Sequence, residues 1–273
     1  MWRSAPFESM CARRSRRDHP PSIPAPDVAF SVLLLAGSGL LLRSLDQLYR
    51  VDMGFSGENV TRATVSLPSA RHDSLVSIVP FFGQLEDRLE QIPGVESVGS
   101  VYGAPLMGGG ISGGVLVEGR PEPANGEGTG ASMWPVTAGY FATMGLTLLR
   151  GRGIESTDQT NTEPVAVVNE EFVRENFPGE EVLGARIRVG ASFGYGPDYW
   201  RVVGLVRDIR RSMSGSTTAE VYPPHTQYGP GFIQVHVRAR PEVGSLVPTI
   251  RAIVHALDPN LVLRGVETVV EAE

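Results

Sequence analysis

The chain has no lysine, and all 24 of its basic residues are arginines. This absence excludes enzymes that depend on a lysine side chain, including P-loop ATPases with a Walker A lysine, protein kinases and Schiff-base enzymes. The chain is therefore not a conventional ATPase by itself. If it belongs to an ATP-driven machine, the ATPase must lie on another chain or domain.

Cysteine is almost absent as well. The single cysteine, Cys11, lies near the N-terminus, so the rest of the chain has no disulfide, thiol chemistry or cysteine metal site. The five histidines form no close pair four residues apart and no H-E-x-x-H pattern, so we expect no metal and no other cofactor. These histidines are His19, His72, His225, His236 and His255. A net charge of −6 without a basic stripe argues against nucleic-acid binding.

Long apolar runs are also scarce. Val28–Leu42 is an uncharged, leucine-rich run that follows an arginine-rich, proline-rich segment. We predict a disordered basic leader at residues 1–27 and a membrane helix with its extension at residues 28–50. Because excess positive charge stays in the cytoplasm, the bulk of the chain would then be periplasmic, at the bacterial inner membrane. A secretory signal segment and a buried helix remain alternatives for this short run.

Two strand–helix–strand patterns lie far apart in the sequence. The first runs from an alternating strand at residues 60–67, through an amphipathic helix at 75–92, to a strand at 95–101. The second repeats this order over residues 232–266. Two such units can pair in one sheet with both helices on one face, which is the split ferredoxin-like arrangement.

We therefore predict an α+β fold with two lobes. Residues 60–103 plus 232–269 would form a split βαβ lobe, and residues 104–231 would form a second α+β lobe inserted into it. Within the insertion, Asn169 is placed to cap a helix that ends at Pro178-Gly179.

Catalytic motifs in the insertion are weak. Residues 110–114 match the letters of a G-x-S-x-G nucleophile elbow, but that motif requires a strand before the serine and a helix after it. Since a glycine run precedes Ser112 and a strand-like segment follows, we predict a mobile loop instead of a catalytic serine. Several aromatic residues favour core packing, with a ligand-binding lobe as the alternative. They are Trp134, Tyr140, Phe141, Trp200 and Tyr222.

Longer strings carry a family resemblance. They include LLLAGSGLLLRSLDQLYRVDMGFSGENVTRATVSLP, PGVESVGSV, VTAGYFATMGLTLLRGR, PVAVVNEEFVRENFPGEEVLGARIRVG, WRVVGLVRDIR and LDPNLVLRGVETV. In order and spacing these strings resemble MacB-like, FtsX-family ABC-transporter permeases, in particular the duplicated permeases abundant in acidobacteria. The resemblance extends from about Leu33 to Val269.

The resemblance implies a periplasmic core domain with a porter-like lobe and an inserted lobe. It also implies the membrane, a cytoplasmic ABC ATPase and the remaining permease segments in trans as partners, with periplasmic proteins as further candidates. Such a domain would couple or sense ATP-driven motion for export or envelope processes, without catalytic residues. The string HPPSIPAPD and the end of the chain at Glu273 depart from the family pattern, so we expect a fragment. A membrane-tethered module that binds a ligand or a protein is the alternative function.

Overall fold

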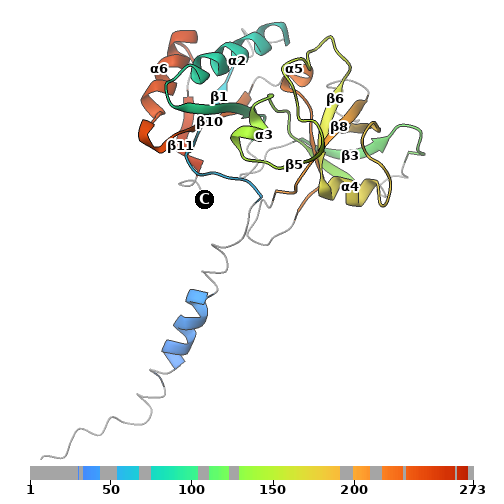
Figure 1. Ribbon diagram of the computed structural model, residues 1–273, viewed down its shortest axis with the longest axis horizontal. Coiled ribbons are helices and arrows are strands. Elements are labelled where there is room, and N and C mark those ends of the chain that lie inside the picture. The colour runs from blue at the N-terminus through green and yellow to red at the C-terminus, as the bar shows by residue number, and fades with distance from the viewer. Residues whose placement is uncertain are drawn as a thin grey trace, which may run out of the picture. The chain divides into compact units, whose positions relative to one another are not determined.

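The computed structural model describes residues 30, 33–43, 54–67, 75–103, 111–122, 129–190, 199–209, 217–229, 232–261 and 263–269. The chain forms two compact units, Met1–Val51 and Asp52–Glu273. Figure 1 shows the second unit as a body of strands with short and long helices around them.

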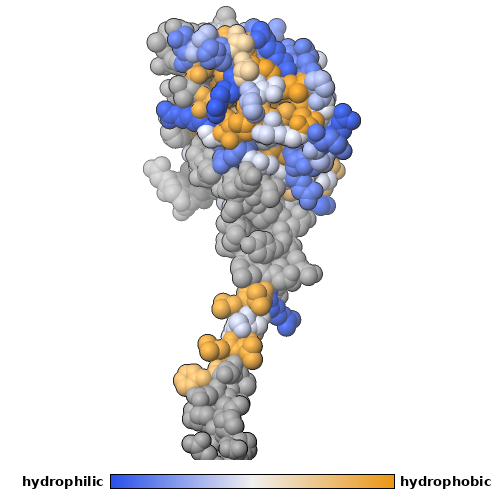
Figure 2. All heavy atoms as spheres, turned by 90° about the vertical axis from the view of Figure 1, so that its left-hand side faces the viewer, coloured by the Kyte–Doolittle hydropathy of each residue, from blue (hydrophilic) through white to orange (hydrophobic). Residues whose placement is uncertain are grey.

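The first unit contains a helix at residue 30 and residues 33–43. Its large apolar side chains are exposed, with Leu35 at 72% of its full accessibility, and Figure 2 shows the helix as mostly hydrophobic. Ser38 and Arg43 add polar positions and make it amphipathic. Residues 33–43 extend about 17 Å at roughly 1.5 Å per residue, whereas a membrane core is roughly 30 Å thick.

Within the described residues, no helix has the length and apolar character needed to cross a membrane. The prediction of a membrane helix at 28–50 is therefore wrong for the described part of that range. The leader predicted at residues 1–27 lies outside the described residues.

A four-stranded antiparallel sheet joins segments from both ends of the second unit. Its strand order is β11-β1-β10-β2, in which β1 is Val60–Ser66, β2 is Val95–Val101, β10 is Phe232–Ala239 and β11 is Leu263–Thr268. Since β1 and β2 both pair antiparallel with β10, they run parallel to each other. This order is the split βαβ arrangement that the two distant sequence patterns predicted.

The two long helices cover this sheet. They are α2 (Leu75–Glu90) and α6 (Val247–Leu257), which lie side by side in Figure 1. Their apolar stripes at three- and four-residue spacing pack on the alternating inner residues of the strands. Phe82, Leu85 and Leu89 of α2 thus share one core with Ile250 and Val254 of α6. Figure 2 shows the face of the second unit on which α6 and β11 lie. On this face, apolar patches lie between hydrophilic ones.

A seven-stranded mixed sheet forms the rest of the second unit. Its order is β5-β8-β6-β9-β4-β3-β7, and a further pairing of β7 with β8 closes the sheet on itself. The strands are β3 Ile111–Val117, β4 Gly130–Met133, β5 Leu148–Gly151, β6 Val165–Asn169, β7 Arg186–Val189, β8 Trp200–Val206 and β9 Glu220–Tyr222.

Short helices lie in the connections of both sheets. They are α3 (Tyr140–Thr143), α4 (Glu170–Asn176), α5 (His225–Tyr228) and the 3₁₀ turn η1 (Pro241–Val243). Asn169 caps α4 as predicted, because its side chain accepts a hydrogen bond from the N–H of Phe172 at 3.0 Å.

An apolar core also joins the two sheets. It combines Val60 and Val101 of the four-stranded sheet with Val206 and Tyr222 of the seven-stranded sheet. Val136 lies between them. It forms one β-bridge to Val101 and another to Pro224, which follows the end of β9 by two residues. Shared apolar packing and shared backbone pairing therefore connect the sheets within one compact unit.

Candidate functional site

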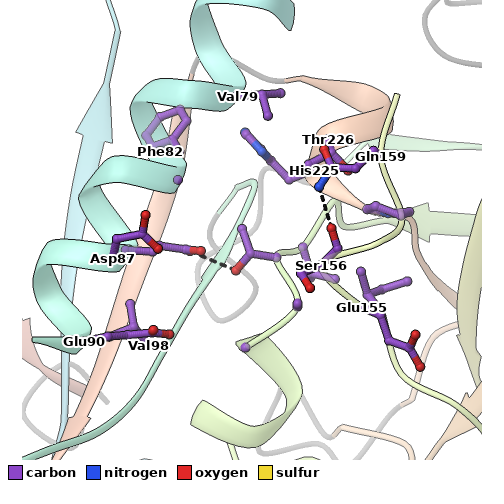
Figure 3. A pocket seen from close by; sticks show the side chains of 18 residues that line it. Val79, Phe82, Asp87, Glu90, Val98, Glu155, Ser156, Gln159, His225 and Thr226 are labelled. Atoms are coloured by element: carbon purple, nitrogen blue, oxygen red, sulfur yellow. Dashed lines mark hydrogen bonds between the residues drawn. The ribbon is translucent and has the colours of Figure 1, made fainter. Parts of the chain in front are cut away.

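A cavity of about 410 Å³ lies beside α2. It lies where α2 meets residues 136–139, the loop at 154–159 and α5. Figure 3 shows Phe82, Asp87 and Glu90 on the helix at one side, with Glu155 and Ser156 on the opposite loop. The cavity volume is in the range of small-molecule sites.

Glu86 connects three elements at the wall of this cavity. Its Oε1 accepts hydrogen bonds from the hydroxyl of Ser100 on β2 at 2.5 Å and from that of Thr137 at 2.9 Å. The Thr137 hydroxyl also accepts a hydrogen bond from the backbone N–H of Ser100 at 2.8 Å. A single carboxyl group thus connects α2 both to the four-stranded sheet and to the segment before α3.

The environment of Glu86 disfavours its negative charge. Burial raises the pKa of Glu86 to about 7, the hydroxyl hydrogen bonds oppose this shift, and the nearby carboxylates of Glu90 and Asp87 raise the pKa further. Glu155 adds a fourth carboxylate to the cavity lining, and no arginine belongs to that lining as the structure describes it. The cavity is therefore acidic in character.

Gly99 and Gly139 allow two backbone segments beside this site to lie in direct contact. A Cβ on Gly139 would lie 1.9 Å from the carbonyl oxygen of Val98, and a Cβ on Gly99 would lie 2.4 Å from the backbone of Tyr140. Only residues without a side chain allow β2 and the start of α3 to approach so closely. The backbone contact places Thr137 within reach of Glu86.

The loop that closes the far wall is fixed by its neighbours. Arg152 forms a two-pronged ion pair with Asp158, with N–O distances of 2.7 and 2.8 Å. Gln227 donates to the carbonyl oxygens of Gln159 and Glu163 at 3.2 and 3.1 Å. These contacts hold the loop in place relative to α5.

The residues singled out in the sequence do not form an active site. Ser112 lies inside β3, so the predicted mobile loop is wrong at this position, and its hydroxyl contacts that of Ser132 at 3.1 Å. It therefore lacks the strand–turn–helix geometry of a nucleophile elbow. No group of three or more potential metal ligands occurs among the described residues. His236 lies in β10 and His255 in α6, as predicted, while His19 and His72 lie outside the described residues.

The five aromatic residues weighed as a ligand-binding set are core residues. Each is at most 8% exposed. His225 is also buried, with its ring edge-on to Phe82 at 5.3 Å between centroids. Core packing, the default interpretation of the aromatic residues, is thus confirmed.

Glu86 was not identified from the sequence, although a clue exists. It lies four residues after Phe82 and directly after Leu85, so it falls on the apolar stripe of α2. A carboxylate in that register indicates either a break in the core or a buried polar contact. Its partners are 14 and 51 residues away in sequence, so the sequence alone could not identify them.

Comparisons with known proteins place this geometry in context. The periplasmic region of MacB from Actinobacillus actinomycetemcomitans has the same fold, with a TM-score of 0.52 and 17% identity over 83% of this chain and 97% of that chain. The extracellular domain of the noncanonic ABC-type transporter YknZ from Gram-positive bacteria gives a TM-score of 0.47 and 15% identity, covering 75% of this chain and 100% of that chain. None of the curated proteins compared with the chain matches it.

Residues 29–253 match the model of the MacB-like periplasmic core domain. The match defines the class, the periplasmic domain of an ABC-transporter permease, which implies ATPase partners and is generally non-catalytic. The chain belongs to this family.

Proposed function

We propose that this domain couples or senses the motion that a cytoplasmic ABC ATPase generates, in the service of export or an envelope process. The observation that carries the proposal is the match to the periplasmic core domain over residues 29–253. The absence of lysine from the chain supports a role in which ATP is hydrolysed by another chain or domain. The membrane concerned would be the bacterial inner membrane, and the remaining permease segments would act in trans.

The two predicted lobes, residues 60–103 plus 232–269 and residues 104–231, give this proposal a mechanical form. Two lobes can transmit motion either by moving relative to each other or by moving together. The apolar core shared by both sheets favours the second mechanism, because large apolar interfaces resist relative domain motion. We infer that the lobes move as one body and transmit motion without large internal rearrangement.

A distance measurement tests this mechanism in the full chain. Cys11→Ser leaves no cysteine, so Glu175→Cys on α4 and Arg251→Cys on α6 provide two exposed labelling sites. The chain is placed in vesicles with the ATPase and permease of a MacB-type transporter, and the spin-label distance is compared with and without ATP. We expect ATP hydrolysis to change when the chain is added, while the label distance stays constant.

Two outcomes contradict the proposal separately. If the chain leaves ATP hydrolysis unchanged and does not cross-link to the transporter, the coupling function is wrong. If the chain couples but the label distance changes on ATP addition, the coupling function stands and the one-body mechanism is wrong.

The cavity beside α2 favours the second candidate, a periplasmic module that binds a ligand or a protein. Its volume of about 410 Å³ is sufficient for a small molecule. A compound that raises the melting temperature of the full chain, but not that of a Phe82→Ala variant, would support binding in this cavity. The subtype, a duplicated permease of the acidobacterial kind, rests on the sequence strings alone.

A further inference from the structure

The cavity beside α2 combines acidic and apolar side chains on both of its walls. Phe82, Glu86 and Glu90 follow one another at four-residue spacing, so they lie on the same face of α2. This face presents an aromatic ring followed by carboxyl groups. On the opposite wall, buried Ile154 and exposed Glu155 repeat the combination. A ligand that fits this cavity should therefore carry both positive and apolar groups.

The carboxylates that line the cavity are poorly neutralised by the protein itself. Among the residues that the structure describes, the side chains of Asp87 and Glu90 form no ion pair and no hydrogen bond. Glu155 has one distant cation, Arg152, whose Nε lies 3.9 Å from its carboxylate. A cationic ligand would supply the countercharge on both walls, and the net charge of −6 would attract it to the chain.

Glu86 adds an acceptor oxygen that is already oriented. Its Oε1 accepts hydrogen bonds from the hydroxyls of Ser100 and Thr137, and these two donors fix the position of the carboxyl group. Its other oxygen, Oε2, accepts no hydrogen bond from any described residue and is not fully buried, so it faces the open space of the cavity. An ammonium group in the cavity could donate a charge-assisted hydrogen bond to Oε2.

An organic amine fits this lining better than a metal ion does. A metal ion needs several ligands that converge on one point, and no group of three or more such ligands occurs in the described part of the chain. Each ammonium group of an amine, by contrast, can bind a single carboxylate. Its methylene chain can pack on apolar side chains, as the stem of a lysine does.

We infer that the cavity binds a linear aliphatic polyamine. Its ammonium groups would lie at the carboxylates of the two walls, and its methylene chain would lie between Phe82 and Ile154. The volume of about 410 Å³ lies in the range of small-molecule sites. This inference rests on the second candidate function, the ligand-binding module, and names its ligand class. It does not depend on the coupling function.

Calorimetric titration of the full chain with spermidine tests the inference. We expect saturable binding to the wild type, with an affinity that falls as salt is added. Glu90→Gln and Glu155→Gln remove one carboxylate from each wall at exposed positions, so both variants should fold. Each should weaken binding about 2- to 5-fold, and the double variant should multiply the two losses. The matched control is Glu175→Gln, which removes the same charge from an exposed position of α4 and should leave the affinity nearly unchanged.

Equal affinities of the double variant and Glu175→Gln would overturn the inference, because spermidine would then respond only to the net charge. Octanediol, an uncharged chain of similar length, separates the ligand class from the candidate function. If octanediol but not spermidine raises the melting temperature of the wild type, and Phe82→Ala abolishes this rise, the polyamine inference is wrong and the ligand-binding candidate is supported. If neither compound binds, the inference is overturned and the cavity loses its support as a small-molecule site.

Discussion

The contact of the four-stranded sheet and α2 with residues 137–140 has two unlike halves. The apolar half consists of Gly99, Gly139, Tyr140 and His236, where backbones touch and the His236 and Tyr140 rings lie 5.9 Å apart. The cavity half is centred on Glu86, which is hydrogen-bonded to hydroxyl groups beside open space. The apolar half depends on close packing around one buried histidine, whereas the cavity half depends on hydrogen bonds between polar side chains.

The two halves should respond to pH in opposite directions. Burial, together with the positive charge of Arg62, lowers the pKa of His236 to about 4. His236 therefore favours the folded state above its ordinary pKa and opposes it in acid, whereas Glu86, whose pKa is raised, favours the folded state in acid. The junction combines a part that weakens in acid with a part that weakens in alkali.

The largest expected effect concerns the glycine contact. Gly139→Ala places a Cβ 1.9 Å from the Val98 carbonyl oxygen, so β2 and α3 must separate. We expect about 3 kcal/mol or more of destabilisation, measured by denaturant unfolding of the full chain. The control is Gly83→Ala on α2, where no atom lies within 4 Å of the new Cβ. It should stabilise the protein by about 0.5–1 kcal/mol, because alanine is the better helix former. A Gly139→Ala variant as stable as wild type would contradict the close contact.

The next effect concerns acid stability at His236. Its pKa of about 4 in the folded chain lies below the ordinary value of 6.5. This contribution to stability is complete above pH 6.5 and is lost as the pH falls through about 4, by a total on the order of 3 kcal/mol. His236→Phe should remove this part of the acid dependence of unfolding, while His255→Asn on α6 should not. Parallel pH profiles for wild type and His236→Phe would refute the assignment.

A smaller loss is expected in the cavity half. Thr137→Val keeps the shape of the side chain but removes the hydroxyl that contacts Glu86 and the N–H of Ser100. We expect destabilisation by about 1–2 kcal/mol, because the backbone N–H loses its partner. Thr157→Val, at an exposed loop position, should change stability by less than about 0.5 kcal/mol. Equal effects in the two variants would show that the Thr137 hydrogen bonds contribute nothing specific.

The smallest effect tests the charges around Glu86. The Glu90 carboxylate raises the pKa of Glu86, so Glu90→Gln should move the midpoint of the Glu86 carboxyl titration, followed by NMR, to lower pH by a fraction of a unit. Glu96→Gln, at an exposed position of β2, should leave that midpoint in place. A shift to higher pH in Glu90→Gln would contradict the electrostatic account of the cavity.

The four-stranded sheet could be predicted because its elements have clear periodicity. Alternation identified β1, β2 and β10, and three- and four-residue spacing identified α2 and α6. The predicted pattern over residues 232–266 ends two residues too early, because its last strand, β11, extends to Thr268. In the insertion, the Asn169 cap of α4 was also predicted.

The missed strands share a physical cause. β4, β5 and β9 have three or four residues each, too few to display alternation. β4 and β9 pair with each other although the chain separates them widely, so long-range pairing defines both. The site depends in the same way on Glu86 meeting Ser100 and Thr137, which only the folded chain brings together.

The most direct test of the account asks whether the two sheets unfold as one body. Hydrogen exchange of the full chain gives the opening free energy of the slowest amides in β10 and in β6. The shared core predicts equal values for both strands, and an equal decrease in both for Gly139→Ala. Opening free energies that differ by more than about 2 kcal/mol, or a decrease confined to one sheet, would contradict a single body.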